Sequence, residues 1–152
     1  MPFTFRLESV LKYRQRIVDD KGRAVAVAQG EVARWNARRM ELDAEINAYL
    51  NQHQSPGLKV QDLVAKTAWL EHLRRRRQEL EAGLSLARMQ LAAAREELQA
   101  SWRDLEVLKQ LRQRQELAWL ADQETRERKE LDEIGQIRSD RASRSIFALK
   151  RA

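Results

Sequence analysis

The sequence predicts an all-α protein: two long helices in an antiparallel coiled-coil hairpin, with the second helix overhanging the first. Three observations carry this prediction: a helix-forming composition, two long heptad patterns of apolar residues, and one turn motif between them. The 152 residues include only two prolines and five glycines, and β-branched residues are too sparse for a sheet. With 43% hydrophobic and 34% charged residues, the chain resembles a folded coiled coil rather than a disordered segment in composition.

The first heptad pattern predicts a helix over residues 5–51. Alternating steps of four and three residues lead from Leu7 to Tyr49 through thirteen positions, of which ten are apolar. A mixed sequence rarely sustains such a seam by chance, so the pattern indicates a coiled coil. The seam positions are Leu7, Leu11, Arg14, Val18, Lys21, Val25, Ala28, Val32, Trp35, Arg39, Leu42, Ile46 and Tyr49.

A turn is predicted over residues 52–59, because Ser55, Pro56 and Gly57 would interrupt any continuous helix. A second seam follows, with eleven apolar residues among fourteen positions. It predicts a second helix over residues 60–138. The seam positions are Leu63, Lys66, Leu70, Leu73, Arg77, Leu80, Leu84, Ala87, Leu91, Ala94, Leu98, Ser101, Leu105 and Leu108.

The lengths of the two seams predict how the helices pair. Folding back near residue 56 would place residue 4 opposite residue 108 or its neighbours. After Leu108 the heptad phase slips, so the rest of the second helix is expected to have no partner. We interpret residues 1–138 as one coiled-coil domain and residues 139–152 as a basic flexible tail. From Arg138 onward, five basic side chains and one acidic side chain give +4 of the net charge of +6.

The residue inventory argues against catalysis and against metal or cofactor binding. There is no cysteine, and His53 and His72 do not by themselves make a metal site. No glycine-rich phosphate loop or nucleophile motif occurs, and the carboxylates alternate with arginines as on an ion-paired helix surface. We expect neither an enzyme nor a cofactor. Without an apolar signal core or a membrane-length apolar stretch, a cytoplasmic protein is expected, with any membrane association made through a partner.

Three further features each leave alternatives open. The arginine run 74–77 could contact nucleic-acid phosphates, but consecutive helical residues spread around the helix, which favours a solvated surface. Trp35 falls on the first seam, whereas Trp69, Trp102 and Trp119 lie off the seams and either seal them or form a partner surface. The four glycines within the predicted helices allow either close helix approach or bending; they are Gly22, Gly30, Gly83 and Gly135.

Several stretches resemble the flagellar type III export protein FliJ family. FTFRLESVLKYRQR at residues 3–16 is similar to the start of that family. ASWRDLEVLKQLRQRQ at residues 100–115 and ETRERKELDEIGQIR at residues 124–138 are similar to its C-terminal helix, with SWR and KELDEIGQIR the most distinctive parts. The resemblance implies a fold similar to the two-helix stalk of the gamma subunit in rotary ATP synthases.

The resemblance also implies a role in bacterial flagellum biogenesis, and through it in chemotaxis. Members of this family are cytosolic components of the export apparatus, peripherally associated with the inner membrane. They insert into the hexameric ring of the export ATPase and promote its assembly. They also link the ring to the cytoplasmic domain of the export gate and handle unloaded export chaperones. No nucleic-acid partner and no direct membrane insertion are expected.

Two groups of residues are candidate contact sites under this resemblance. Tyr49, Trp69 and Leu73 match the family surface that docks to the export gate. Six basic residues near the ends of the two predicted helices are candidates for the export ATPase, namely Arg6, Lys12, Arg16, Arg126, Lys129 and Arg138. Phe3 and Phe5 are expected to brace the start of the first helix against the overhang.

Other functions remain open from the residues alone. A stalk protein of a virulence-type secretion system would share the architecture and differ in its partners. A nucleic-acid-binding coiled coil would show a steep salt dependence of binding. A self-associating spacer would use the same seams between chains, and its sedimentation would depend on concentration.

Overall fold

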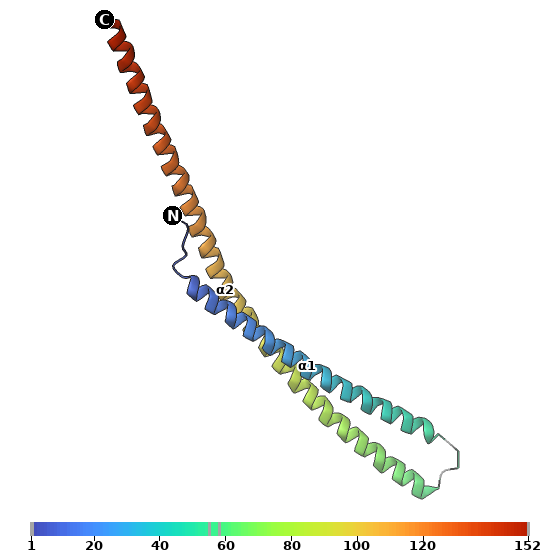
Figure 1. Ribbon diagram of the computed structural model, residues 1–152. Coiled ribbons are helices and arrows are strands. Elements are labelled where there is room, and N and C mark those ends of the chain that lie inside the picture. The colour runs from blue at the N-terminus through green and yellow to red at the C-terminus, as the bar shows by residue number, and fades with distance from the viewer. Residues whose placement is uncertain (1, 55, 58, 152) are drawn as a thin grey trace. The chain divides into compact units, whose positions relative to one another are not determined.

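The computed structural model describes residues 2–54, 56–57 and 59–151, and these residues form two α-helices and no strand. Helix α1 spans Glu8–Gln52 and helix α2 spans Val60–Arg151 (Figure 1). The two helices pack against each other as a helical hairpin, which confirms the predicted all-α fold. Helix α2 continues beyond the predicted end near residue 138, so residues 139–151 are helical where the sequence analysis expects a flexible tail. The flexibility of that segment stays a prediction, and Ala152 lies outside the described residues.

The chain divides into two compact units. One unit is Tyr13–Leu105, which holds most of α1, the turn and the first half of α2. The other combines Met1–Lys12 with Glu106–Ala152, and so joins the start of α1 to the second half of α2. The heptad pattern predicts one domain over residues 1–138, and this assignment stays a prediction.

The core of the Tyr13–Leu105 unit follows the two predicted seams. Every predicted seam position of α1 is buried or half-buried, as are all but two positions of the seam in α2. Leu73, Leu84 and Leu105 are completely buried. Removal of these apolar side chains from water is the main favourable term that holds the helices together. The two exceptions are Leu63 and Arg77, which are exposed.

Most basic residues in the seams pair with carboxylates across the hairpin. In the Tyr13–Leu105 unit four of the five basic seam residues lie 2.6–3.3 Å from such a carboxylate, and the fifth, Lys66, donates to the carbonyl of His53. A charged group at a seam position favours the register in which its partner is in reach. The pairs are Arg14 with Asp104, Lys21 with Glu97, Arg39 with Glu81, and Arg77 with Asp43.

Gly83 shows why one of the helical glycines is needed. A Cβ atom at this position would lie 2.5 Å from Cζ3 and 2.6 Å from Cη2 of Trp35 on the opposite helix. The absence of a side chain therefore makes room for the indole ring. Gly22, Gly30 and Gly135 have open space around the same position. At Gly83, therefore, the glycine allows close helix approach, which was one of the two predicted roles of the helical glycines.

The turn between the helices contains a glycine in a left-handed conformation. Gly57 has φ of 101°, which a residue with a side chain rarely adopts. The backbone N–H groups of Asp62 and Leu63 donate to the carbonyl of Lys59 and start α2. Ser55, part of the predicted turn motif, lies outside the described residues, as does Leu58.

In the second unit, the residues before α1 pack on α2. The ring centroids of Phe3 and Trp119 lie 6.2 Å apart, and Phe5 is only 7% exposed. Glu8 lies 3.6 Å from Arg112. The contact of Phe3 with Trp119 confirms the predicted brace for Phe3, and Phe5 is buried as a brace requires. All residues from 124 to 151 are exposed, and in Figure 1 this red end of α2 has no other segment of its unit beside it.

The side-chain contacts of this unit are offset along α2. Phe3 meets Trp119 and Glu8 meets Arg112, so these partners lie further from the turn than the predicted placement of residue 4 opposite about residue 108 would suggest. The Cα–Cβ bonds of a helix lean toward its own N-terminus. In an antiparallel pair, side chains of the first helix therefore reach away from the turn and those of the second reach toward it. Long side chains that meet between the helices consequently come from a more distant residue of α2.

Candidate partner-binding surfaces

Four ring-bearing side chains gather near the turn in the Tyr13–Leu105 unit, and we call them the aromatic cluster: Tyr49, His53, Trp69 and His72. Tyr49 stacks on His53 with ring centroids 4.1 Å apart, and it lies 6.3 Å from Trp69 across the hairpin. The Trp69 and His72 centroids are 5.3 Å apart. The two histidines were not predicted as part of this surface, although their spacings of four residues from Tyr49 and three from Trp69 place each on the same helix face.

The cluster is held from both helices and is open to solvent on one side. His53 Nδ1 lies 2.8 Å from the carbonyl oxygen of Tyr49, and Lys66 Nζ donates to the carbonyl of His53 at 3.0 Å. Trp69 is 42% exposed. An indole that is held in place and half-exposed has the properties of an interface anchor.

Leu73, the third candidate for gate docking, lies in a different environment from Tyr49 and Trp69. Its side chain is completely buried between the helices. It cannot reach a partner while the hairpin is closed. Its place one turn after Trp69 on α2 gives it a packing role beneath the cluster rather than a contact on its surface.

The arginine run 74–77 lies beside the cluster. All four residues are exposed, and Arg77 pairs with Asp43 of α1 at 3.3 Å. A shallow hollow is lined by His72, Arg75, Arg76 and Glu79. The outer surface of α2 next to Trp69 is therefore polar and mainly cationic.

The six candidate residues for the export ATPase are all exposed and lie in both units. Arg16 belongs to the Tyr13–Leu105 unit, and the other five belong to the second unit. Arg126 pairs with Asp122 at 2.7 Å, one turn earlier on α2. Lys129 and Arg138 follow on the part of α2 that is exposed on all sides. The structure thus places each of these cations on the surface of its own unit.

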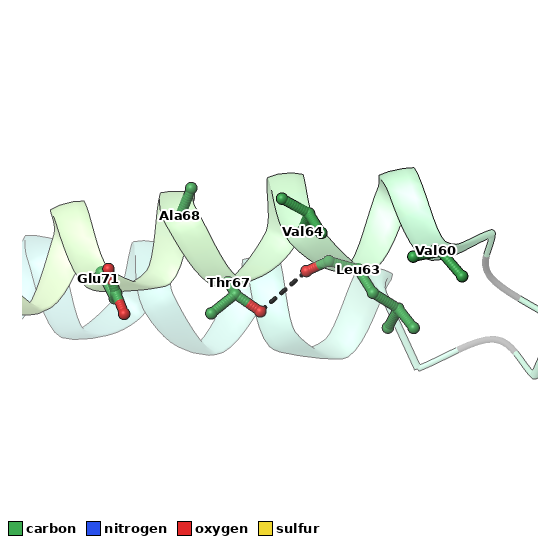
Figure 2. A pocket seen from close by; sticks show the side chains of 6 residues that line it. All are labelled: Val60, Leu63, Val64, Thr67, Ala68 and Glu71. Carbon is green, nitrogen blue, oxygen red and sulfur yellow. Dashed lines mark hydrogen bonds between the residues drawn. The ribbon is translucent and has the colours of Figure 1, made fainter.

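An apolar surface at the start of α2 was missed by the sequence analysis. Figure 2 shows its lining residues, Val60, Leu63, Val64, Thr67, Ala68 and Glu71, which all belong to one helix. Val64 is 64% exposed, and Figure 2 shows it pointing away from α1 together with Ala68. The Thr67 hydroxyl donates to the Leu63 carbonyl at 2.8 Å, so it is satisfied within the helix. The spacing of Val60, Val64 and Ala68 could have revealed this stripe, but it lies beside the stronger seam pattern, which begins at Leu63.

The described residues hold no group of three or more acidic, histidine or cysteine side chains placed to bind a metal ion. Within the same part of the chain, no helix is long and apolar enough to span a membrane.

The paired helices, their apolar seams and their surface clusters define a coiled-coil hairpin protein whose exposed features are suited to protein contacts. A family model described as "Flagellar FliJ protein" matches residues 3–144. The chain belongs to the flagellar FliJ family. It is accordingly a flagellar export-related protein that interacts with components of the export apparatus. No curated protein and no solved structure matches the chain significantly.

Proposed function

We propose that this protein is the stalk and adaptor of the flagellar export apparatus. In this role it inserts into the hexameric ring of the export ATPase, promotes ring assembly, and links the ring to the export gate and to unloaded export chaperones. It acts in the cytoplasm, at the inner-membrane export apparatus, and contributes no catalytic group.

The observation that supports this proposal is that the two ends of α2 have different environments in a member of the FliJ family. Its first half is committed to the hairpin, whereas residues 124–151 are exposed on every side. A helix that is already formed can enter a ring with little further loss of conformational entropy. Binding that favours the assembled ring over separate subunits shifts the equilibrium toward the ring.

We assign the export ATPase and the export gate to two different surfaces of the chain. The exposed cations Arg126, Lys129 and Arg138 support a contact with acidic surfaces of the ATPase. Tyr49 and Trp69 support a contact with the gate, because half-exposed aromatic side chains are frequent interface anchors. Leu73 belongs to the gate surface only as the residue that packs beneath it.

The experiment that tests the proposal is a titration of the purified export ATPase with the full chain. The hydrolysis rate and the fraction of ATPase in rings, scored by electron microscopy, are followed together. We expect both to rise with added protein, and we expect deletion of residues 126–152 to abolish both effects.

A matched pair of charge variants locates the contact. Replacement of Arg126, Lys129 and Arg138 by glutamine should weaken stimulation, because three exposed cations are lost from the ring-binding segment. Replacement of Arg74, Arg75 and Arg76 by glutamine removes the same charge from the hairpin and should leave stimulation unchanged. An unchanged hydrolysis rate with no ring formation by the wild-type chain would reject the stalk function.

A further inference from the structure

The last turns of α2 form a basic, amphipathic helix. The proposed function gives no reason for its amphipathic character. We call residues 138–151 the basic segment. All of its residues are exposed and helical. Its five basic side chains and one acidic side chain give a net charge of +4. Among the ion pairs of the described residues, none involves this segment.

The helical period separates the basic segment into two sides. At about 100° per residue, one side carries the segment's large apolar residues together with small ones. These residues are Ser139, Ala142, Ser143, Ile146, Phe147 and Leu149, and the same side carries one basic residue, Lys150. The opposite side carries Arg138, Arg141, Arg144 and Arg151 with the single acidic residue, Asp140. A helix with an apolar side and a strongly basic side is typical of segments that lie in a membrane interface.

The apolar side is unusually open to water. Ile146 is 57% exposed, Phe147 68% and Leu149 78%. Arg151 lies over the ring of Phe147, 6.0 Å from its centroid, at the border between the two sides. Exposed apolar side chains next to unpaired cations are stabilised by a surface that supplies both an apolar phase and negative charge.

We propose that, in a chain that is not inserted in the ATPase ring, the basic segment binds the surface of an anionic lipid bilayer, parallel to the membrane plane and without crossing it. Ile146, Phe147 and Leu149 enter the headgroup region, and the arginines of the opposite side lie near lipid phosphates. Lys150 lies within the apolar side, and a flexible ammonium can reach back to the headgroups, whereas a closed protein groove would bury its charge. A nucleic acid supplies phosphates but no apolar phase for these side chains. This contact would be direct, whereas the sequence predicts membrane association only through a partner.

The test is flotation of the full chain with lipid vesicles. The two preparations are phosphatidylcholine alone and phosphatidylcholine with about one third phosphatidylglycerol. We expect flotation only with the anionic vesicles, and we expect it to weaken as salt is raised. Because each basic residue near such a surface contributes about 1 kcal/mol, the variant R141Q/R144Q/R151Q should lower the partition coefficient by about 100-fold.

Two further variants separate lipid binding from general attraction of charge. R74Q/R75Q/R76Q loses the same charge from the hairpin and should float like the wild type. I146S/L149S keeps every charge and should lower the partition coefficient by at least about 10-fold, because it removes apolar side chains from the lipid.

The proposal is wrong if the wild-type chain does not float with anionic vesicles at low salt. It is also wrong if I146S/L149S floats like the wild type, or if the hairpin variant loses as much binding as the segment variant. If the chain stimulates the ATPase but fails to float, the stalk function stands and the lipid contact is rejected. If it floats but leaves the ATPase unchanged, the lipid contact stands alone.

Discussion

Single residues fix how closely the two helices approach. The indole of Trp35 occupies the space that a Cβ atom of Gly83 would fill. Arg38 lies 5.2 Å from the centroid of the same ring and restrains it within α1. The ring therefore has contacts on its own helix as well as across the hairpin, and it cannot move aside without losing some of them.

Gly83→Ala is expected to lower the free energy of unfolding, because the overpacking cost of about 1–3 kcal/mol exceeds the gain in helix propensity of about 1 kcal/mol. Gly30→Ala is the matched control, since its Cβ would meet open space. That variant should be more stable than the wild type by about 1 kcal/mol. Urea unfolding followed by circular dichroism measures both, and an equal gain in the two variants would contradict the role assigned to Gly83.

Trp69 gives a prediction for the proposed gate contact. Trp69→Ala should weaken binding of the gate's cytoplasmic domain at least about 10-fold, because a half-exposed aromatic anchor is lost, and should leave ATPase stimulation unchanged. Trp102→Ala is the control, since Trp102 is similarly exposed, at 46% against 42%, and lies outside the aromatic cluster. Calorimetric titration measures the affinities, and equal losses in both variants would count against the cluster as the docking site.

The buried neighbour of Trp69 should behave differently from Trp69 itself. Leu73→Ala is expected to lower the free energy of unfolding by about 2–5 kcal/mol, because it opens a cavity between the helices. Any loss of gate binding in Leu73→Ala should therefore accompany lower stability. A Leu73→Ala protein with unchanged unfolding but weak gate binding would mean that Leu73 contacts the partner directly.

At the scale of the elements, the halves of α2 differ in what stabilises them. Leu84 and Leu105 are completely buried against α1, whereas residues 139–151 have only local contacts. Long helices derive most of their stability from packing of an apolar side. The basic residues Lys150 and Arg151 in the last turn interact favourably with the helix dipole, but this effect is confined to that turn.

Amide hydrogen exchange should therefore separate the two halves of α2. We expect slow exchange around Leu84 and Leu105 and much faster exchange over residues 139–151, which open without breaking interhelical contacts. Exchange followed by mass spectrometry checks this in the full chain. Equal protection in the two regions would contradict it. Addition of anionic vesicles should slow exchange in residues 139–151 if the basic segment binds lipid.

At the scale of the whole molecule, the net charge of +6 governs how the chain meets acidic partners. Its association rate with the export ATPase should fall steeply between about 0.1 M and 1 M salt, as the Debye length shrinks from about 10 Å to about 3 Å. The dissociation rate should change less. Stopped-flow measurements test this, and the variant R126Q/K129Q/R138Q should show a shallower salt dependence. A rate independent of salt would argue against electrostatic attraction in ring binding.

Much of the fold could be predicted because its signals are local in sequence. A heptad seam depends only on residues three and four positions apart, so the buried positions of both helices were identified correctly, Val18 and Leu84 among them. Arg14, Lys21 and Arg39 are the positions of the first seam that are not apolar. Their partners lie far away in sequence, and only the structure shows them as cross-helix ion pairs.

The candidate surfaces were predictable only in part. Tyr49 and Trp69 do meet, and the second seam already includes Leu73, which is buried. The contacts of His53 with Tyr49 and of His72 with Trp69 were not predicted, although their spacing places each pair on one helix face. The burial of a side chain near a seam depends on the exact rotation of each helix, which heptad spacing gives only approximately.

The sequence by itself determined that this protein consists of two long helices joined by a turn, because helix propensity, seam period and the Pro56–Gly57 motif all act over a few residues. The tertiary structure alone decided which residues face one another. Register depends on contacts made across the hairpin, such as the ring of Phe3 near that of Trp119 and the indole of Trp35 over Gly83. Those contacts depend on the space between two backbones, which is not a property of one segment.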